Sequence, residues 1–340
     1  MSKETYCGQP CCFTTVANTA KKMLLIELTN KCNLACPYCH SRPNEGGNNA
    51  LGYERLVRLL DECRENNFDT VIVSGGEPLV SPDVFRFAEE IRNRGFNTDL
   101  CTNGILVTES KAETIARYFP SVTVTLDTID PEVYGKMKNC DKRFFYKAYD
   151  GIKYLTAAGV RVGVTIVLTR YNFMRIDEVI NELKQLGVKK VSLLRLFNTA
   201  GSNDYEFEYS EENVKLMLEK AMSTEGIKVK LKGWDFDTPK FPLCSAGANA
   251  FAVDHEGYLL PCILIRDHSA ECNLADHSLS EAMNGAGISG FRNKIEHLNC
   301  ESCSYNNDCK KGCPASSYNI NGTITPDIRC GYRKETDNAD

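Results

Sequence analysis

The sequence predicts an α/β fold in which a parallel sheet with flanking helices precedes a smaller cysteine-rich region. Between about residues 23 and 198, short apolar, β-branched runs alternate with longer stretches of helical periodicity. Beyond about residue 230 this alternation fades, and the chain becomes rich in Cys, Gly, Asn and Asp. Six strand–helix units in series normally build a parallel sheet, which closes fully or stays open as a partial barrel.

The expected strands and helices follow the apolar pattern along the chain. The strands cover residues 23–29, 70–76, 97–104, 122–128, 162–169 and 190–197. The helices cover residues 52–66, 81–94, 109–118, 144–158 and 176–186, with a further helix over 211–222. Gly95, Gly159 and Gly187 follow three of these helices at positions suited to a C-cap. Because parallel sheets bind ligands at the carboxyl ends of their strands, we expect the functional loops there.

Composition and charge exclude several classes of protein. Of the 340 residues, 42% are hydrophobic and 25% are charged, which is usual for a soluble globular chain. A formal net charge of -5 provides no broad attraction to nucleic acid or to anionic lipid. No apolar run reaches the roughly 18 to 20 residues that cross a bilayer, and the first residues lack the apolar centre of a signal peptide. We therefore expect a cytoplasmic protein without nucleic-acid or membrane partners.

The unusual feature of the composition is its 17 cysteines. A chain of this length does not need disulfides for stability, so clustered cysteines in a reducing compartment indicate metal binding or redox catalysis. Most of them fall in two regions, residues 32–39 and residues 244–330. Three others, Cys7, Cys11 and Cys12, lie in an N-terminal extension over residues 1–22, and their spacing indicates no particular site.

The first region carries a C-x3-C-x2-C motif directly after the first expected strand. Its cysteines are Cys32, Cys36 and Cys39. Three thiolates in one short loop can hold three irons of a 4Fe-4S cluster and leave the fourth iron open to another ligand. Structural zinc is the alternative, with His40 as a fourth ligand, because such zinc normally takes four protein ligands.

This motif, with Tyr38 just before its last cysteine, resembles the signature of the radical S-adenosylmethionine family. The resemblance implies that the open iron chelates S-adenosylmethionine and that an electron from the cluster releases a 5'-deoxyadenosyl radical. The second strand ends in SGGEP, which resembles the glycine-rich motif that contacts the methionine amino group in this family. The motif residues are Gly75, Gly76, Glu77 and Pro78, and Glu77 would offset the positive charge of that amino group.

Weaker matches follow at the ends of later strands. The resemblance makes Asn103, Thr125 and Lys138 candidates for contact with the cofactor, while an ordinary turn or surface role remains the alternative for each. Asn172 and Arg195 are expected to face the same cavity, because they lie after or within the last two of the six strands.

The C-terminal cysteines form a C-x2-C-x5-C-x3-C array that resembles the SPASM domain of radical enzymes. The resemblance implies that one auxiliary 4Fe-4S cluster is held by Cys300, Cys303, Cys309 and Cys330. A second auxiliary cluster would be held by Cys244, Cys262 and Cys313, one ligand short of four. An open iron, Cys272 or an N-terminal thiol would complete it.

Three other cysteines invite a different role. Cys272 is interpreted as a cluster ligand, a hydrogen-atom donor to a substrate radical or an ordinary buried thiol. Cys101 and Cys140 are considered for the same donor role, but a small apolar residue of the core is the favoured interpretation of both.

Taken together, the motifs predict a partial (β/α)6 TIM-like barrel over residues 23–230 and a small iron-sulfur SPASM domain over residues 231–335. The expected cofactors are S-adenosylmethionine and three 4Fe-4S clusters, with flavodoxin or ferredoxin as the reducing partner. The expected activity, of oxidoreductase or epimerase type, is crosslinking, epimerisation or dehydrogenation of a ribosomally made peptide. A small molecule such as a tetrapyrrole or aminosugar is the alternative substrate. An iron-sulfur electron carrier or scaffold and a zinc-organised interaction protein are alternatives of other classes.

Overall fold

A nine-stranded sheet forms the framework of the computed structural model, which describes residues 21–41, 43–44, 51–196, 211–232, 244–266, 268, 271–298 and 312–325. Its strands are β1 (Lys22–Glu27), β2 (Phe68–Ser74), β3 (Asn97–Thr102), β4 (Ser121–Thr125), β5 (Arg161–Leu168), β6 (Lys190–Arg195), β7 (Lys228–Lys232), β8 (Ala250–Val253) and β9 (Leu259–Leu260). They follow the order β7-β6-β5-β4-β3-β2-β1-β8-β9, and only β8 and β9 pair antiparallel. The α/β class with a mostly parallel sheet is thereby confirmed.

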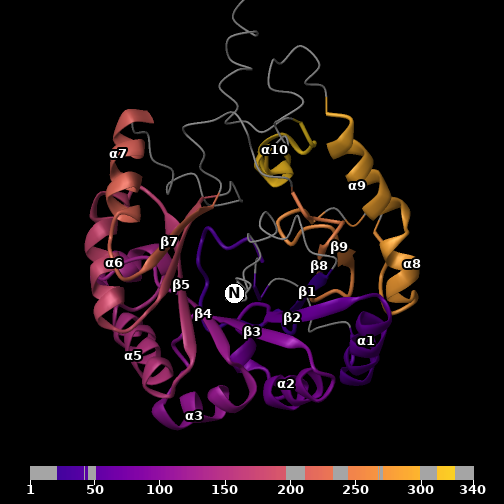
Figure 1. Cartoon of the computed structure of the whole chain (residues 1–340), viewed down its shortest axis with the longest axis horizontal. Coiled ribbons are helices and arrows are strands. Elements are labelled where there is room, and N and C mark those ends of the chain that lie inside the picture. Colours follow the sequence, from indigo (N-terminus) through magenta and orange to yellow (C-terminus); the bar gives the residue numbers. More distant parts are fainter. Residues whose placement is uncertain are drawn as a thin grey trace, which may run out of the picture.

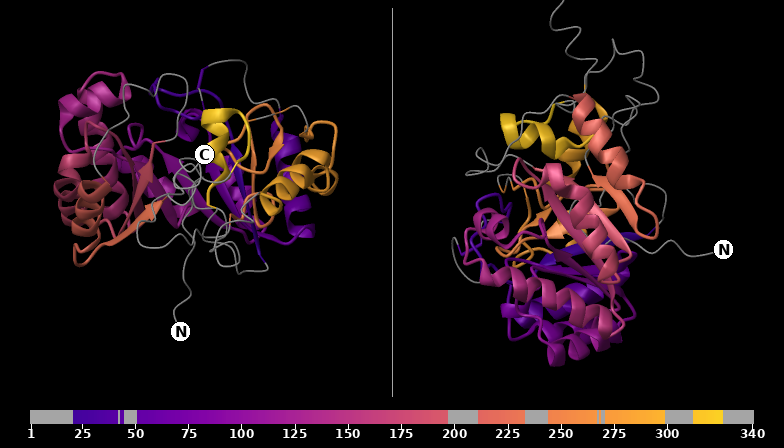
Figure 2. Two further views of the ribbon diagram at one scale, coloured as in Figure 1. Left: turned by 90° about the horizontal axis from the view of Figure 1, so that it is seen from above. Right: turned by 90° about the vertical axis from the view of Figure 1, so that its left-hand side faces the viewer.

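The helices lie mainly on the outer side of this curved sheet (Figure 1). They are α1 (Tyr53–Glu65), α2 (Val84–Asn93), α3 (Glu109–Tyr118), α4 (Pro131–Lys138), α5 (Arg143–Ala157), α6 (Ile176–Gln185), α7 (Glu211–Met222), α8 (Leu279–Met283), α9 (Ala286–Glu296) and α10 (Pro314–Asn321), with short 3-10 turns η2 (Pro78–Val80) and η3 (Phe173–Arg175). Figure 1 shows α10 at the open end of the curve, and seen from above it lies over the middle of the molecule (Figure 2). None of the described helices combines the length and the apolarity needed to cross a membrane.

Alternate residues of β1 face opposite sides of the sheet, and each side packs in a core. Leu24 and Ile26 pack in the core between the sheet and the outer helices. Met23 and Leu25 point to the concave side, where they pack in a second core with residues from the C-terminal part of the chain. A strand covered on both faces reads as a continuous apolar run, which is the pattern of MLLI in the sequence.

Helix α4 is an element that the apolar pattern did not predict. Asp130 caps it, because its Oδ1 accepts hydrogen bonds from the backbone N–H groups of Glu132 and Val133 at 2.9 and 3.2 Å. Pro131 occupies the first turn, and Asn139 ends the helix in the left-handed region with φ 51°. The helix has only 8 residues, so local capping chemistry rather than a long apolar stripe carries the signal.

The sheet also continues beyond the six strands that the sequence predicted. On one side β7 pairs with β6 across the expected boundary at residues 230 and 231. On the other side β8 pairs with β1, so a part of the C-terminal region is built into the sheet rather than packed as a separate unit. The extension was not predicted because AFAV is short, yet all four residues are buried where they cover the edge of β1.

Candidate functional site

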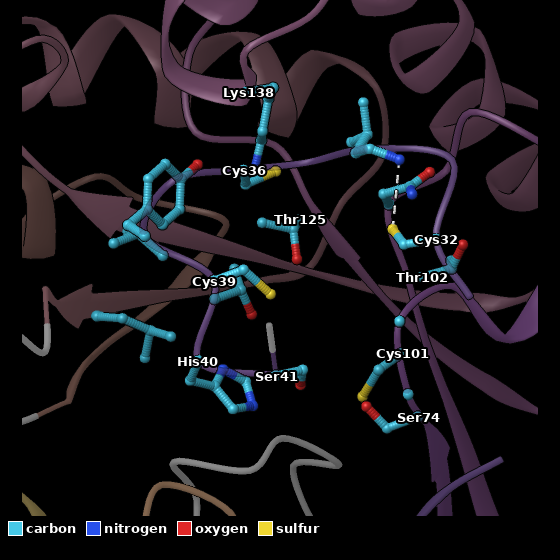
Figure 3. Close-up of a pocket in the computed structure, with 18 of the residues that line it drawn as sticks. Cys32, Cys36, Cys39, His40, Ser41, Ser74, Cys101, Thr102, Thr125 and Lys138 are labelled. Atoms are coloured by element: carbon cyan, nitrogen blue, oxygen red, sulfur yellow. Dashed lines mark hydrogen bonds between the residues drawn. The ribbon is translucent and has the colours of Figure 1, made fainter. Parts of the chain in front are cut away.

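A cavity of about 210 Å³ lies where the parallel strands end (Figure 3). The loop after β1 brings Cys32, Cys36 and Cys39 to its wall, and β2 to β6 supply most of the rest of the lining. Lys138 of α4 and Leu264 of the C-terminal region also line it. Figure 3 shows the three labelled thiols around the same space. The structure thus brings together the motif that the sequence singled out and the sheet edge where binding loops were expected.

The loop after β1 that carries Cys32, Cys36 and Cys39 is called the cysteine loop. The glycine-rich turn after β2 supports it through backbone hydrogen bonds. The N–H of Gly76 donates to the carbonyl of Thr29 at 2.8 Å, and the N–H of Glu77 donates to the carbonyl of Lys31 at 2.8 Å. A Cβ on Gly76 would lie 2.4 Å from the Lys31 carbonyl oxygen, which is too close for any side chain. Gly75 and Gly76 line the cavity, and they also let the two backbones approach.

We expect Gly76→Ala to weaken iron retention strongly, because the new Cβ must push Lys31 and the adjacent Cys32 out of place. Iron analysis of the reconstituted protein measures the effect. Gly52→Ala is the matched control, since Gly52 has an extended backbone at φ -62° and a Cβ there would meet nothing within 4 Å. Equal iron content in both variants would contradict the supporting role of the turn.

Glu77 organises the end of β3 instead of facing the cavity. Its Oε1 accepts hydrogen bonds from the Thr102 hydroxyl at 2.8 Å and the Leu79 N–H at 3.1 Å, and its Oε2 accepts one from the Asn103 N–H at 2.8 Å. Burial raises the pKa of this carboxyl, and the same hydrogen bonds oppose the rise. In the described chain, Glu77 and Pro78 lie outside the cavity lining, so the expected contact of Glu77 with a methionine amino group is not formed by this arrangement.

The weaker sequence candidates separate into two groups. Asn103, Thr125, Lys138 and Arg195 line the cavity. Asn172 is buried elsewhere, and its side-chain amide donates to the carbonyl groups of Asp127 and Val167, both at 2.8 Å. It therefore ties the end of β4 to β5, which is a structural role that its position after a strand did not reveal.

A buried hydrogen bond and a buried ion pair join the cysteine loop to α4 and to the end of β4. The Tyr38 hydroxyl donates to Oδ2 of Asp127 at 2.6 Å, and the Lys138 ammonium lies 2.6 Å from the same oxygen. Lys138 also lies over the Tyr38 ring, 5.2 Å from its centroid. Burial alone would lower the pKa of Lys138, but the Asp127 carboxylate holds it well above its usual value. The sequence pointed to Thr125 at the end of β4 and to Lys138, but not to this role of Asp127.

A second polar cluster connects the cysteine loop to the C-terminal region. Glu27, at the end of β1, forms an ion pair with Arg266, lies 3.3 Å from Nδ1 of His255, and accepts a hydrogen bond from Ser41 at 2.8 Å. Burial would raise the pKa of Glu27, but Arg266 and His255 outweigh burial and lower it to about 2. The Glu27 carboxylate is therefore ionised and holds both segments against the sheet.

The spacing of the thiols fits an iron-sulfur cluster better than zinc. Around tetrahedral zinc, thiolate sulfurs lie about 3.8 Å apart, as follows from a Zn–S bond of about 2.3 Å. Within the described residues, no three ligand atoms of the cysteine loop, His40 included, lie within 4.8 Å of one another. A 4Fe-4S cluster binds each thiolate at a different iron, so it accepts sulfur atoms that lie farther apart.

Burial raises the pKa of Cys32 to about 11 and of Cys36 to about 12, so both thiols must lose a proton when they bind metal. One further observation agrees with a bound group in this cavity. The Thr165 hydroxyl lines the cavity at 3% exposure and has no hydrogen-bond partner in the described structure. A buried hydroxyl without a partner is costly, so a polar ligand in the cavity would satisfy it.

Three of the seven C-terminal cysteines expected to hold the auxiliary clusters are described, and they meet on the concave side of the sheet. Cys244 and Cys262 are buried in the second core, and Cys313 packs against it. Burial raises the pKa of Cys262 well above its usual value, and the neighbouring Cys244 and Cys313 thiols raise it further. The expected ligands Cys300, Cys303, Cys309 and Cys330 lie outside the described residues, as do Cys7, Cys11 and Cys12.

The three proposed donor cysteines take different places. Cys101 lines the cavity, on β3. Cys272 packs against the outer core, with its sulfur close enough to Gly285 that a Cβ there would lie 2.9 Å away. Cys140 follows the last turn of α4 and donates its N–H to the Gly135 carbonyl at 3.0 Å. Cys272 and Cys140 are not among the described residues that line the cavity.

Comparisons with known proteins agree with this geometry. Residues 26–183 match the family model described as "Radical SAM superfamily". A "Probable GTP 3',8-cyclase" of Sulfurisphaera tokodaii is 24% identical, over 72% of this chain and 82% of that protein. "Mycofactocin maturase MftC" of Mycobacterium tuberculosis is 25% identical, over 86% of this chain and 78% of that protein.

A solved structure shows that the fold extends beyond the matched segment. SuiB of Streptococcus suis, in the structure bound to S-adenosylmethionine, has a TM-score of 0.75 at 18% identity, over 92% of this chain and 77% of that chain. The structure of SuiB bound to precursor peptide SuiA has the same TM-score of 0.75 at 16% identity, over 92% of this chain and 76% of that chain. The shared fold therefore includes most of the C-terminal region.

Proposed function

Residues 26–183 form a radical SAM domain, and on this premise we propose that the chain cleaves S-adenosylmethionine reductively and abstracts a hydrogen atom from a ribosomally made peptide. The observation that carries the proposal is the convergence of Cys32, Cys36 and Cys39 on one cavity, with a wider spacing than zinc takes. An electron carrier would not need a cavity of about 210 Å³ beside these thiols.

The chain's own residues define what the cavity does. Cys32, Cys36 and Cys39 would hold three irons of a 4Fe-4S cluster, and that cluster with S-adenosylmethionine would supply a 5'-deoxyadenosyl radical. Asn103, Thr125 and Lys138 line the cavity and would offer polar groups for hydrogen bonds to the cofactor.

We further infer a SPASM-type C-terminal region with two auxiliary 4Fe-4S clusters. The meeting of Cys244, Cys262 and Cys313 on the concave side supports one of them. Cys300, Cys303, Cys309 and Cys330 would hold the other. A one-electron donor of the flavodoxin or ferredoxin class would reduce the clusters.

A peptide is the proposed substrate because peptide-modifying proteins recur among the relatives and structural neighbours. The names of MftC and of the SuiB complex with its precursor peptide support this choice. A small-molecule substrate is the second candidate, because a GTP 3',8-cyclase is also a relative.

The proposal is tested by incubating the reconstituted, reduced protein with S-adenosylmethionine and measuring 5'-deoxyadenosine. We expect the nucleoside to form only when both the reductant and S-adenosylmethionine are present. An iron-loaded protein that releases no nucleoside would instead be an electron carrier or scaffold.

Iron and sulfide analysis under anaerobic conditions tests the number of clusters. Three complete 4Fe-4S clusters give about 12 irons per chain. A value near four would leave only the cluster of the cysteine loop and would contradict the auxiliary clusters. A zinc-organised protein would instead be colourless.

A further inference from the structure

Asn44 closes the cysteine loop on itself through its side-chain amide. Its Oδ1 accepts a hydrogen bond from the Cys32 N–H at 3.1 Å, and its Nδ2 donates one to the Cys32 carbonyl at 3.2 Å. Its own N–H donates to the carbonyl of Asn30 at 2.9 Å. The amide therefore pairs with both backbone groups of Cys32 as a neighbouring strand would, although the two residues are 12 positions apart in the chain.

The backbone of Asn44 has the left-handed conformation, with φ 67°. Outside glycine this conformation is uncommon, and asparagine tolerates it better than most residues. Among the described residues, Asn67 and Asn139 are the others of this kind, and they lie at the C-terminal ends of α1 and α4, where a left-handed residue is usual. Asn44 follows no helix in the described chain, so its conformation points to the contact with Cys32 instead.

The contact of Asn44 lies at the surface, unlike the contacts of Tyr38 and Ser41 in the same loop. Tyr38 donates to Asp127, which is 0% exposed. Ser41 donates to Glu27, which is 1% exposed. Asn44 is an exposed residue, and water competes for the hydrogen bonds of exposed groups, so its contact contributes little to the stability of the whole fold. What this contact can determine is the local position of the backbone that it binds.

The backbone at Cys32 determines where its thiolate is presented. A cysteine side chain has a single rotatable bond before the sulfur, so few sulfur positions exist for one backbone position. The Leu34 N–H donates to the Cys32 sulfur at 3.4 Å, drawn as the dashed line at Cys32 in Figure 3, and this bond narrows the choice further. Holding the Cys32 backbone therefore holds its sulfur toward the cavity that Cys36 and Cys39 also line.

We propose that Asn44 is a positioning residue of the cluster site, which holds the Cys32 thiolate on its iron through the backbone of Cys32. This inference rests on the radical SAM chemistry proposed above, in which Cys32, Cys36 and Cys39 bind three irons of one cluster. Without the amide, the Cys32 end of the loop gains freedom, while Cys36 and Cys39 stay held by the buried contacts of the loop. The bond between Cys32 and its iron is then the first to open.

Asn44→Gly is the variant that tests this role. Glycine adopts a positive φ readily, so the variant removes the amide and still allows the same backbone conformation. Asn67→Gly is the matched control, because Asn67 is also exposed, has φ 63° and makes no side-chain hydrogen bond in the described structure. Any general effect of an asparagine-to-glycine change at a left-handed position therefore occurs in both variants.

The measurement is the initial rate at which iodoacetamide alkylates each loop thiol in the reconstituted, iron-loaded protein, mapped by mass spectrometry. A thiolate bound to iron is protected, so the labelling reports the opening of each cysteine–iron bond. We expect Cys32 to react several-fold faster in Asn44→Gly than in the wild type, with Cys36 and Cys39 unchanged. Asn67→Gly should match the wild type at all three thiols. Equal rates at Cys32 in the two variants would overturn the positioning role.

Unfolding of the metal-free protein separates positioning from a general structural role. We expect Asn44→Gly and Asn67→Gly to unfold at the same denaturant concentration. A lower midpoint for Asn44→Gly, together with faster labelling of all three loop thiols, would make Asn44 a structural residue and refute the proposal, while 5'-deoxyadenosine formation by the wild type still upholds the proposed function. If the loop thiols of the iron-loaded wild type react as fast as those of the metal-free protein, both proposals fail.

Discussion

Cys36→Ala is expected to abolish 5'-deoxyadenosine formation and to remove about four irons per chain. Cys36 lines the cavity between the other two thiols of its loop, and two thiolates do not hold a cluster with one open iron. Iron analysis and nucleoside measurement on the same preparation test both expectations.

Cys140→Ala is the matched control for this experiment. Cys140 is a half-buried thiol of the same barrel, but it is not among the described residues of the cavity wall. It should retain the iron and the activity of the wild type. Nucleoside formation by Cys36→Ala at the wild-type rate would show that the cysteine loop does not hold the reactive cluster.

Where the fold follows from local patterns, the sequence predicted it well. Residues 109–118 were expected to be a helix, and α3 covers the same residues. Here Thr108 caps the helix through a hydrogen bond from the Lys111 N–H, and Ile115 anchors the apolar face in the core. The six expected strands became β1 to β6 because parallel strands covered on both sides are continuous apolar runs.

Polar contacts between residues far apart in the chain could not be predicted from the sequence. Tyr38 and Asp127 are 89 residues apart, and no periodicity connects a tyrosine of a loop with an aspartate that ends a strand. Glu77 was expected to face the cofactor, yet the hydroxyl and N–H groups at the end of β3 bind its carboxylate. Motif spacing fixes which residues share a loop, but side-chain direction depends on neighbours brought in by the fold.

The cysteines considered as hydrogen-atom donors show the same difference between what a motif reveals and what the fold determines. Sequence context drew attention to Cys272, because it stands in a cysteine-rich region. The alternation of side chains along β3 determines which way Cys101 points, since a shift by one residue would turn its side chain to the outer core. The register that fixes this direction was not available from the pattern NTDLCT, in which apolar and polar residues do not alternate.

Lys138→Met is expected to lower the free energy of unfolding of the metal-free protein by roughly 3 to 5 kcal/mol. The side chains of Lys138 and Asp127 are 4% and 0% exposed, so the variant leaves a buried carboxylate without its counter-charge. Tyr38 and the Val167 N–H still donate to Asp127 at 2.6 and 2.7 Å, but neutral donors do not replace the ammonium. Denaturant unfolding under anaerobic conditions measures the loss.

Two further variants separate the buried charge from the loss of packing. In Asp127→Asn/Lys138→Met the charge is gone and the amide can still accept from Tyr38, so much of the lost stability should return. Lys142→Met serves as the surface control, because Lys142 and its partner Glu132 are 55% and 73% exposed, and it should unfold as the wild type does. If the double variant is no more stable than Lys138→Met alone, the ion pair is not what holds the cysteine loop against β4. The contact of the Lys138 ammonium with the Tyr38 ring, 5.2 Å from its centroid, would then account for the lost stability.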